Sequence, residues 1–253
     1  MSGALEGRTA LVTGASRNLG KAIAERLAAA GATVAIHGRT PRGEAAGVAA
    51  QMRRDTGRDH LAVAGELDGA AATRSVVQDA LDGLGGRIDI LVHNAGPFSM
   101  TPFATLAEDE WDEVWDVNVK AAYVAAQVVA PAMREAGWGR VVVISAGSAY
   151  LRNHAVYGLA KQALGFLAEE LALELGPAIT VSAIAPGQIE ESAADIAEYD
   201  PTFVERAVAH TPAGRLVTRA EVAELAVLLC GSQFAMVTGA TLPVDGGWRF
   251  NRF

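Results

Sequence analysis

Short apolar runs rich in β-branched residues recur along the whole chain and alternate with longer segments of helical periodicity. A short run without a polar face predicts a strand that is buried on both sides of a sheet. The seven runs span residues 9–13, 33–37, 61–64, 88–92, 140–145, 179–184 and 241–244. Between them, apolar residues recur three and four positions apart, which predicts amphipathic helices, most clearly over 20–30, 70–81, 111–135 and 155–175.

The regular alternation of strand and helix predicts an α/β fold. Parallel strands joined by right-handed crossover helices form one doubly wound, Rossmann-type sheet, here of about seven strands with helices on both faces. No linker divides the chain, so residues 1–253 are expected to form a single domain. Residues 188–212 lie outside the alternation and follow the sixth strand, where a ligand crevice opens. We expect a substrate lid there, with a plain surface insertion as the alternative.

Composition and charge argue against several classes of protein. Of 253 residues, 51% are hydrophobic and 20% are charged, a balance too apolar for a disordered chain. The net charge of −8 argues against general binding to nucleic acid or anionic membranes. Without an apolar run long enough to span a membrane or a signal peptide, the protein is expected in the cytoplasm. The one cysteine, Cys230, is expected in the core, and no cluster has metal-ligand spacing.

The first predicted strand runs directly into the segment from Thr13 to Gly20 and then into a helix. Glycines in such a turn let the backbone approach a pyrophosphate and present amides at the positive end of the helix dipole. The turn resembles the Thr-Gly-x-x-x-Gly-x-Gly segment of the short-chain dehydrogenase/reductase family. Asn18 replaces its middle glycine and is a side chain that tolerates positive φ. The resemblance implies that the cofactor contacts Gly14, Ser16, Arg17, Asn18, Leu19 and Gly20.

The end of the second strand indicates which dinucleotide binds. An NAD enzyme would place an acidic residue here for the adenosine ribose, and the segment from His37 to Thr40 has none. Arg17 and Arg39 instead offer two cations near the expected 2′-phosphate. The sequence therefore favours NADP, in practice NADPH, over NAD.

Further segments resemble the same family in order, from about residue 6 to residue 248. His93 stands in place of the first Asn of an Asn-Asn-Ala-Gly segment, and Glu191 stands where a Thr is expected, with Ser192 as a substitute. Residues 244–247 match the family's terminal segment. The resemblance implies further cofactor contacts through Glu66, Leu67, Asn94, Ala95, Gly96, Pro186, Gly187 and Ile189.

Tyr157 and Lys161 lie four residues apart in a predicted helix, so both side chains project from one face. Hydride transfer to a carbonyl requires a proton to move at the carbonyl oxygen, which Tyr157 can supply or accept. The Lys161 cation and an oxidised nicotinamide are expected to favour the phenolate. The resemblance further implies that Lys161 binds the nicotinamide ribose and that Asn118 extends a proton relay to solvent through a water.

The serine that would polarise the substrate carbonyl is displaced in this sequence. The expected position, after the fifth strand, is occupied by Ala146, with Ser145 before it and Ser148 after it. Side chains alternate along an extended chain, so Ser148 shares the side of Ala146 and is the favoured candidate over Ser145. Gly147 can bend the chain and defeat this argument.

These observations predict an NADPH-dependent oxidoreductase acting on a small carbonyl or alcohol substrate, most similar to 3-oxoacyl-carrier-protein reductases. The alternative is a non-catalytic protein that senses the cofactor on the same fold. A homotetramer is expected, because helices around 119–132 and 158–175 carry apolar residues over more than one face. A moderately apolar pocket is expected, with His154 as a polar contact, and its walls are expected to be formed by Phe98, Met100, Phe103, Tyr150, Leu151 and Ile189. The alternative is that these residues belong to the core.

Overall fold

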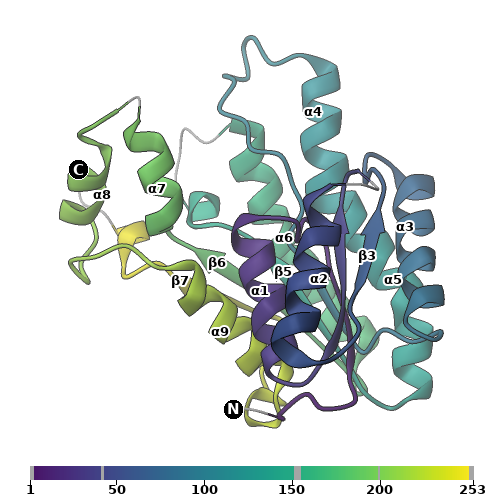
Figure 1. Ribbon diagram of the computed structural model, residues 1–253. Coiled ribbons are helices and arrows are strands. Elements are labelled where there is room, and N and C mark those ends of the chain that lie inside the picture. The colour runs from purple at the N-terminus through teal and green to yellow at the C-terminus, as the bar shows by residue number, and fades with distance from the viewer. Residues whose placement is uncertain (1–2, 41–42, 151–154, 199, 251–253) are drawn as a thin grey trace.

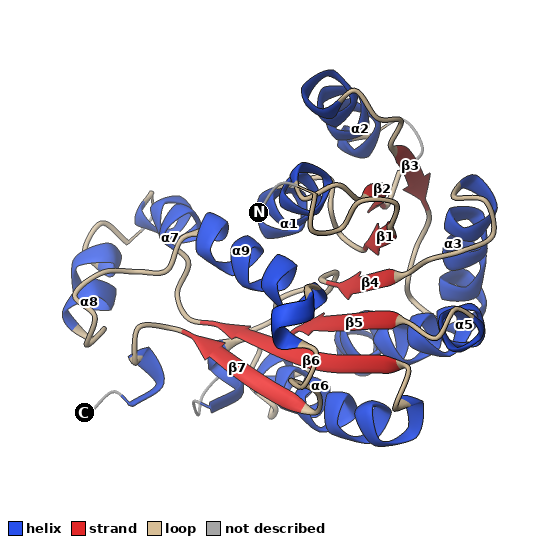
Figure 2. Ribbon diagram, turned by 90° about the horizontal axis from the view of Figure 1, so that it is seen from below, coloured by secondary structure: helices blue, strands red, loops and turns tan. Residues whose placement is uncertain are grey.

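Seven parallel strands form one sheet in the computed structural model, which describes residues 3–40, 43–150, 155–198 and 200–250. The strands lie in the order β3-β2-β1-β4-β5-β6-β7 (Figure 2). They are β1 Thr9–Val12, β2 Thr33–Gly38, β3 Leu61–Ala64, β4 Ile90–His93, β5 Gly139–Ile144, β6 Ile179–Pro186 and β7 Ala240–Val244. The predicted doubly wound sheet is confirmed, and its order reverses between β1 and β4, where a ligand crevice is expected.

Helices cover both faces of this sheet because each buries one apolar stripe against it. One core cluster joins α1 Asn18–Ala29, α2 Glu44–Thr56 and α9 Arg219–Cys230 to the strands. A second joins α3 Ala70–Gly83, α5 Ala121–Glu135 and α6 Ala155–Leu175 to the opposite face. Figure 2 shows these two layers on either side of the strands. Cys230 is buried in the first cluster, as predicted.

The long predicted helix over 111–135 contains an irregular turn. It consists of α4 Glu108–Trp115, a π-helical turn Asp116–Lys120 and α5. The extra residue of a π turn displaces the helix register locally, a feature that recurs at functional sites. Asn118 lies in this turn and is fully buried.

Two short helices occupy residues 188–212, where the sequence predicts only a weak helical pattern. They are α7 Glu190–Ala197 and α8 Phe203–Ala209, and they lie to the left in Figure 1, beyond the carboxyl end of β6. An isolated bridge between Ile189 and Val217 fixes the start of α7. Short 3₁₀ turns follow three other elements, at Gly147–Tyr150, Ser232–Phe234 and Trp248–Phe250.

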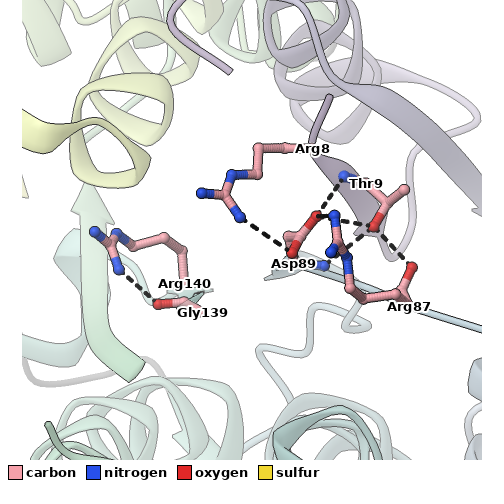
Figure 3. Close-up of polar contacts among 6 residues, drawn as sticks. All are labelled: Arg8, Thr9, Arg87, Asp89, Gly139 and Arg140. Carbon is pink, nitrogen blue, oxygen red and sulfur yellow. Dashed lines mark hydrogen bonds and ion pairs between the residues drawn. The ribbon is translucent and has the colours of Figure 1, made fainter. Parts of the chain in front are cut away.

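The buried carboxylate of Asp89 links neighbouring strands at their amino ends, opposite the carboxyl ends where the crevice is expected (Figure 3). Asp89 accepts a hydrogen bond from the Thr9 amide at 3.0 Å and pairs with Arg87 at 3.1 Å and Arg8 at 3.4 Å. Its carbonyl accepts from the Arg140 amide. β4 begins at Ile90, two residues later than the apolar run predicts. This charged cluster stabilises the sheet at the amino ends of β1 and β4.

No helix within the described ranges is long and apolar enough to cross a membrane. The same part of the chain holds no group of three or more His, Cys, Asp or Glu side chains in a metal-binding arrangement.

Candidate functional site

The turn after β1 has the backbone geometry that the sequence predicts. Gly14 has a φ of +62° and Asn18 a φ of +50°, so Asn18 adopts the left-handed conformation expected of it. A Cβ at Gly14 would lie 2.9 Å from Ala95 Cα, and one at Gly20 would lie 2.6 Å from Asn94 Nδ2. Gly14 is required because the backbone after β4 packs directly against it, and Gly20 because a side chain there would overlap the Gly14 carbonyl.

Hydrogen bonds from the segment after β4 hold this turn in place. Asn94 Nδ2 donates to the Thr13 and Gly14 carbonyls at 3.2 and 3.0 Å. The Asn94 and Ala95 amides donate to Thr13 Oγ1 at 3.0 and 3.1 Å. The sequence singles out Asn94 and Ala95 as cofactor residues, and the structure places them against the turn that would carry the diphosphate.

Two buried histidines support the same turn, a role that the sequence analysis did not find. His37 Nδ1 accepts the Gly14 amide at 3.1 Å and His37 Nε2 donates to the Gly65 carbonyl at 3.0 Å. His93 Nε2 donates to the Val117 carbonyl at 3.0 Å, and Thr13 Oγ1 lies 3.1 Å from His93 Nδ1. The signal was present in the sequence: each histidine ends or nearly ends an apolar strand that predicts burial on both faces.

Burial keeps both rings neutral. Desolvation lowers the pKa of His37, and desolvation together with the nearby Lys161 charge lowers the pKa of His93 to about 3. A neutral ring that donates from Nε2 accepts at Nδ1, so Thr13 Oγ1 donates to His93. Thr13 thus accepts two amides and donates one hydrogen, which satisfies its hydroxyl completely.

The residues predicted to bind the adenosine half lie in the turn after β1 and at the carboxyl ends of β2 and β3. Arg17 precedes α1 and is exposed, and Arg39 is exposed directly after β2. Ser16 lies against Gly38. Glu66 is exposed, whereas the Leu67 side chain is 3% exposed and belongs to the core.

Tyr157 and Lys161 share one face of α6, as predicted. Lys161 is 3% exposed, and its Nζ lies 5.5 Å from the Tyr157 ring and donates to the Ile144 carbonyl at 2.8 Å. The Phe98 ring packs edge-on against Tyr157, with centroids 4.9 Å apart. The pair therefore lies beneath an aromatic side chain at the carboxyl end of β5.

The pKa values of this pair differ from the sequence-based expectation. Desolvation raises the pKa of Tyr157 to about 12 and lowers the pKa of Lys161 to about 7. The predicted lowering by the lysine cation is outweighed, because burial disfavours charge on both groups and Lys161 is only partly charged at neutral pH. Tyr157 consequently holds its proton in the protein alone, which is the form that a proton donor needs.

Asn118 faces the same region from the π-helical turn. Its Nδ2 donates to the Val114 and Pro97 carbonyls at 2.8 and 3.2 Å, while Oδ1 is buried and has no partner among the described residues. A Cβ at Gly96 would lie 2.5 Å from Asn118 Cγ, so Gly96 is needed for the close approach. The free amide oxygen can accept a hydrogen bond from a water.

The two candidate serines have different surroundings. Ser145 Oγ donates to the Lys161 carbonyl at 2.6 Å and joins β5 to α6. Ser148 Oγ is buried without a partner within the described ranges. The expected alternation of side chains does not extend to Ser148, because the chain coils into a 3₁₀ turn at Gly147 instead of staying extended. Ser148 nevertheless has the uncommitted hydroxyl.

The segment after β6 approaches the end of β7. A Cβ at Gly187 would lie 2.7 Å from Asp245 Cβ, so glycine is required next to Pro186. Ile189 precedes α7 and packs partly buried against the α1 and α9 side of the core. Glu191 accepts the Arg219 amide at 3.1 and 3.2 Å, which gives this unexpected acid a role at the first turn of α9.

The residues predicted to wall the pocket do not all lie beside Tyr157. Phe98, Met100, Phe103 and Tyr150 are exposed, and Phe98 contacts Tyr157. Phe103 instead lies 6.4 Å from the Trp111 ring and lines a separate groove along the start of α4. Leu151 and His154 lie outside the described residues.

Residues 14–249 match the protein family described as enoyl-(acyl carrier protein) reductase. The chain is similar to a rhamnolipid-biosynthesis 3-oxoacyl-(acyl carrier protein) reductase of Pseudomonas aeruginosa, at 36% identity over 96% of this chain and 97% of that protein. Gluconate 5-dehydrogenase of Burkholderia cenocepacia, solved with NADP and tartrate, is 30% identical with a TM-score of 0.89 over 98% and 97% of the two chains. L-Sorbose reductase of Gluconobacter frateurii, solved with NADPH and L-sorbose, is 27% identical with a TM-score of 0.91 over the full length of both.

Proposed function

Because the chain belongs to the short-chain dehydrogenase/reductase family, we propose that it transfers a hydride between NADPH and a carbonyl or alcohol substrate of the 3-oxoacyl type. The protein is an NAD(P)-dependent oxidoreductase. The observation that carries the finer proposal is the buried face of α6, where a protonated Tyr157 lies beside Lys161. Ser148, whose hydroxyl has no partner among the described residues, lies in the 3₁₀ turn that precedes α6.

The residues of the crevice fit a dinucleotide. The turn after β1 leaves no room for side chains at Gly14 and Gly20 and opens into the N-terminus of α1, which suits a diphosphate. The nicotinamide supplies the hydride when it is bound. NADPH is proposed over NADH because Arg17 and Arg39 flank the expected position of the 2′-phosphate and no acid follows β2.

The proton is handled by the protein. Tyr157, with a pKa of about 12, is protonated at neutral pH and donates to the carbonyl oxygen during reduction. Ser148 Oγ donates a hydrogen bond to the same developing oxyanion. Lys161 binds the nicotinamide ribose and, with Asn118, returns a proton to Tyr157 through water. The ligand-free protein therefore holds Tyr157 in the protonated form that carbonyl reduction uses.

Assembly as a homotetramer is also proposed. On α5 and α6, the exposed fractions of Tyr123, Leu159, Phe166 and Leu173 are 44, 41, 64 and 82%. Large apolar side chains at such exposure on neighbouring helices suit a helical interface between copies. Light scattering at micromolar concentration tests this, and a monomer would overturn it.

The lid formed by residues 188–212 and the location in the cytoplasm remain predictions.

Single-turnover oxidation of bound NADPH tests the function directly. The protein is mixed with one equivalent of NADPH and a panel of 3-oxoacyl thioesters, simple ketones, quinones and pterins, and the loss of reduced-nicotinamide absorbance is followed. Turnover with the 3-oxoacyl compounds is expected to be fastest. Tight NADPH binding with no oxidation by any compound would instead support the cofactor-sensing alternative, for which Ala146 at the expected serine position is the specific observation.

A further inference from the structure

Glu191 is fixed in a position that leaves the side chain of Arg219 free. Both Glu191 carboxylate oxygens accept the Arg219 main-chain amide, at 3.1 and 3.2 Å, across 28 positions of sequence. The acid therefore binds the first turn of α9, where the helix dipole favours a negative charge. This contact uses the backbone of Arg219 and makes no demand on its guanidinium.

The Arg219 guanidinium has unused hydrogen-bonding capacity. Its Nη2 donates to Ser192 Oγ at 3.4 Å, and its Nε is buried with no partner among the described residues. No carboxylate of the described chain lies within ion-pair distance of it, whereas Lys21 pairs with Glu25 and Arg26 pairs with Glu224 on the neighbouring surface. A buried guanidinium nitrogen without a partner costs free energy that a bound anion can offset.

Arg219 lines the same groove as the turn after β1. The groove, of about 1020 Å³, crosses the outer face of α1 between α2 and α9, and at one end it is lined by Ser16, Arg17, Asn18, Glu191 and Arg219. That end lies at the N-terminus of α1, where Arg17 provides no side-chain cap and the first helical amides are available to an anion. Arg219 thus lines, from the start of α9, the same end of the groove as the turn after β1.

We propose that Arg219 is a further cofactor-binding residue that holds the diphosphate of the dinucleotide from the α9 side. This inference rests on the proposed use of a dinucleotide. A guanidinium binds phosphate oxygens through two parallel N–H donors, and it also offsets the negative charge that Glu191 brings to this corner. Arg219 would therefore serve NADPH and NADH equally, in contrast to Arg39, which lies beside the 2′-phosphate position.

Binding titrations of three ligands separate these roles. Intrinsic fluorescence follows NADPH, NADH and adenosine 2′-monophosphate binding to the whole protein carrying Arg219→Gln. The loss of one charge-assisted contact is expected to weaken NADPH and NADH by the same factor, about tenfold. Adenosine 2′-monophosphate lacks the diphosphate and should bind as tightly as to the wild type. Arg219→Lys should recover part of the lost affinity.

Arg54→Gln is the matched control, since Arg54 lines the same groove from α2. It should leave all three affinities unchanged. Arg219→Gln keeps the main-chain amide that Glu191 binds, so its melting temperature should match the wild type. Unchanged dinucleotide affinity, a loss confined to NADPH, or an equal loss in Arg54→Gln would each overturn the assignment. A wild-type protein that binds neither dinucleotide would instead refute the proposed function and this inference with it.

Discussion

The Ser145 hydroxyl donates to the main-chain carbonyl of Lys161 at 2.6 Å. This bond joins the end of β5 to the helix that carries the lysine, and both partners are buried. It uses the one hydroxyl hydrogen of Ser145 within the fold. Ser148, three residues later, has a buried oxygen with no partner in the part of the chain that the structure describes. The two serines should therefore respond differently to the same substitution.

Ser148→Ala is expected to lower kcat/KM by about 100-fold, because one donor to the oxyanion is lost. Its stability should stay near that of the wild type, since no protein partner loses a bond. Ser145→Ala should lower the free energy of unfolding by about 1 to 3 kcal/mol through the broken buried hydrogen bond, with a smaller effect on turnover. Steady-state kinetics and urea unfolding of both variants measure this contrast. A stable Ser145→Ala variant with the larger kinetic loss would reverse the assignment.

Tyr157→Phe is expected to abolish turnover and leave NADPH affinity nearly unchanged, because it removes only the hydroxyl that carries the proton. The ring can keep its edge-on contact with Phe98. Lys161→Ala should reduce both turnover and NADPH affinity, and also stability, since the Ile144 carbonyl loses its donor. Fluorescence titration combined with kinetics distinguishes the two variants. Near-normal kcat in Tyr157→Phe would show that the proton comes from another group.

The strands and most helices could be predicted because their apolar periodicities are local properties of the sequence. What could not be predicted depends on contacts between distant segments. Glu191 acts on an amide 28 residues away, and His37 joins Gly14 to Gly65 across two strands. The 3₁₀ turn at Gly147 could not be predicted either, because glycine permits both an extended and a coiled backbone.

Arg39→Ala should weaken NADPH binding by about tenfold and leave NADH binding unchanged, because only NADPH carries the 2′-phosphate. Paired fluorescence titrations with both dinucleotides measure the ratio. Arg53→Ala is the control, since Arg53 is an exposed cation on α2 that pairs with Asp59 at 3.0 Å. An equal loss for both dinucleotides in Arg39→Ala would place Arg39 elsewhere than at the 2′-phosphate.

The pH dependence of stability should carry a contribution from His93. Its pKa is lowered from 6.5 to about 3 by burial, so between these values the unfolded chain binds a proton that the folded protein excludes. The free energy of unfolding therefore rises with pH across this window. The contribution of His93 is lost as the pH falls from about 6.5 toward 3. The full shift corresponds to about 5 kcal/mol at the acid end.

His93→Asn should flatten this dependence, because asparagine does not titrate and its side-chain amide can still donate a hydrogen bond toward the Val117 carbonyl. Urea unfolding at a series of pH values between 4 and 7 compares the two proteins. His37, whose pKa is lowered in the same direction, remains in both and contributes equally to each slope. The difference between the slopes is therefore the contribution of His93. Parallel curves would mean that His93 is protonated in the folded state, and that Thr13 cannot be donating to its Nδ1.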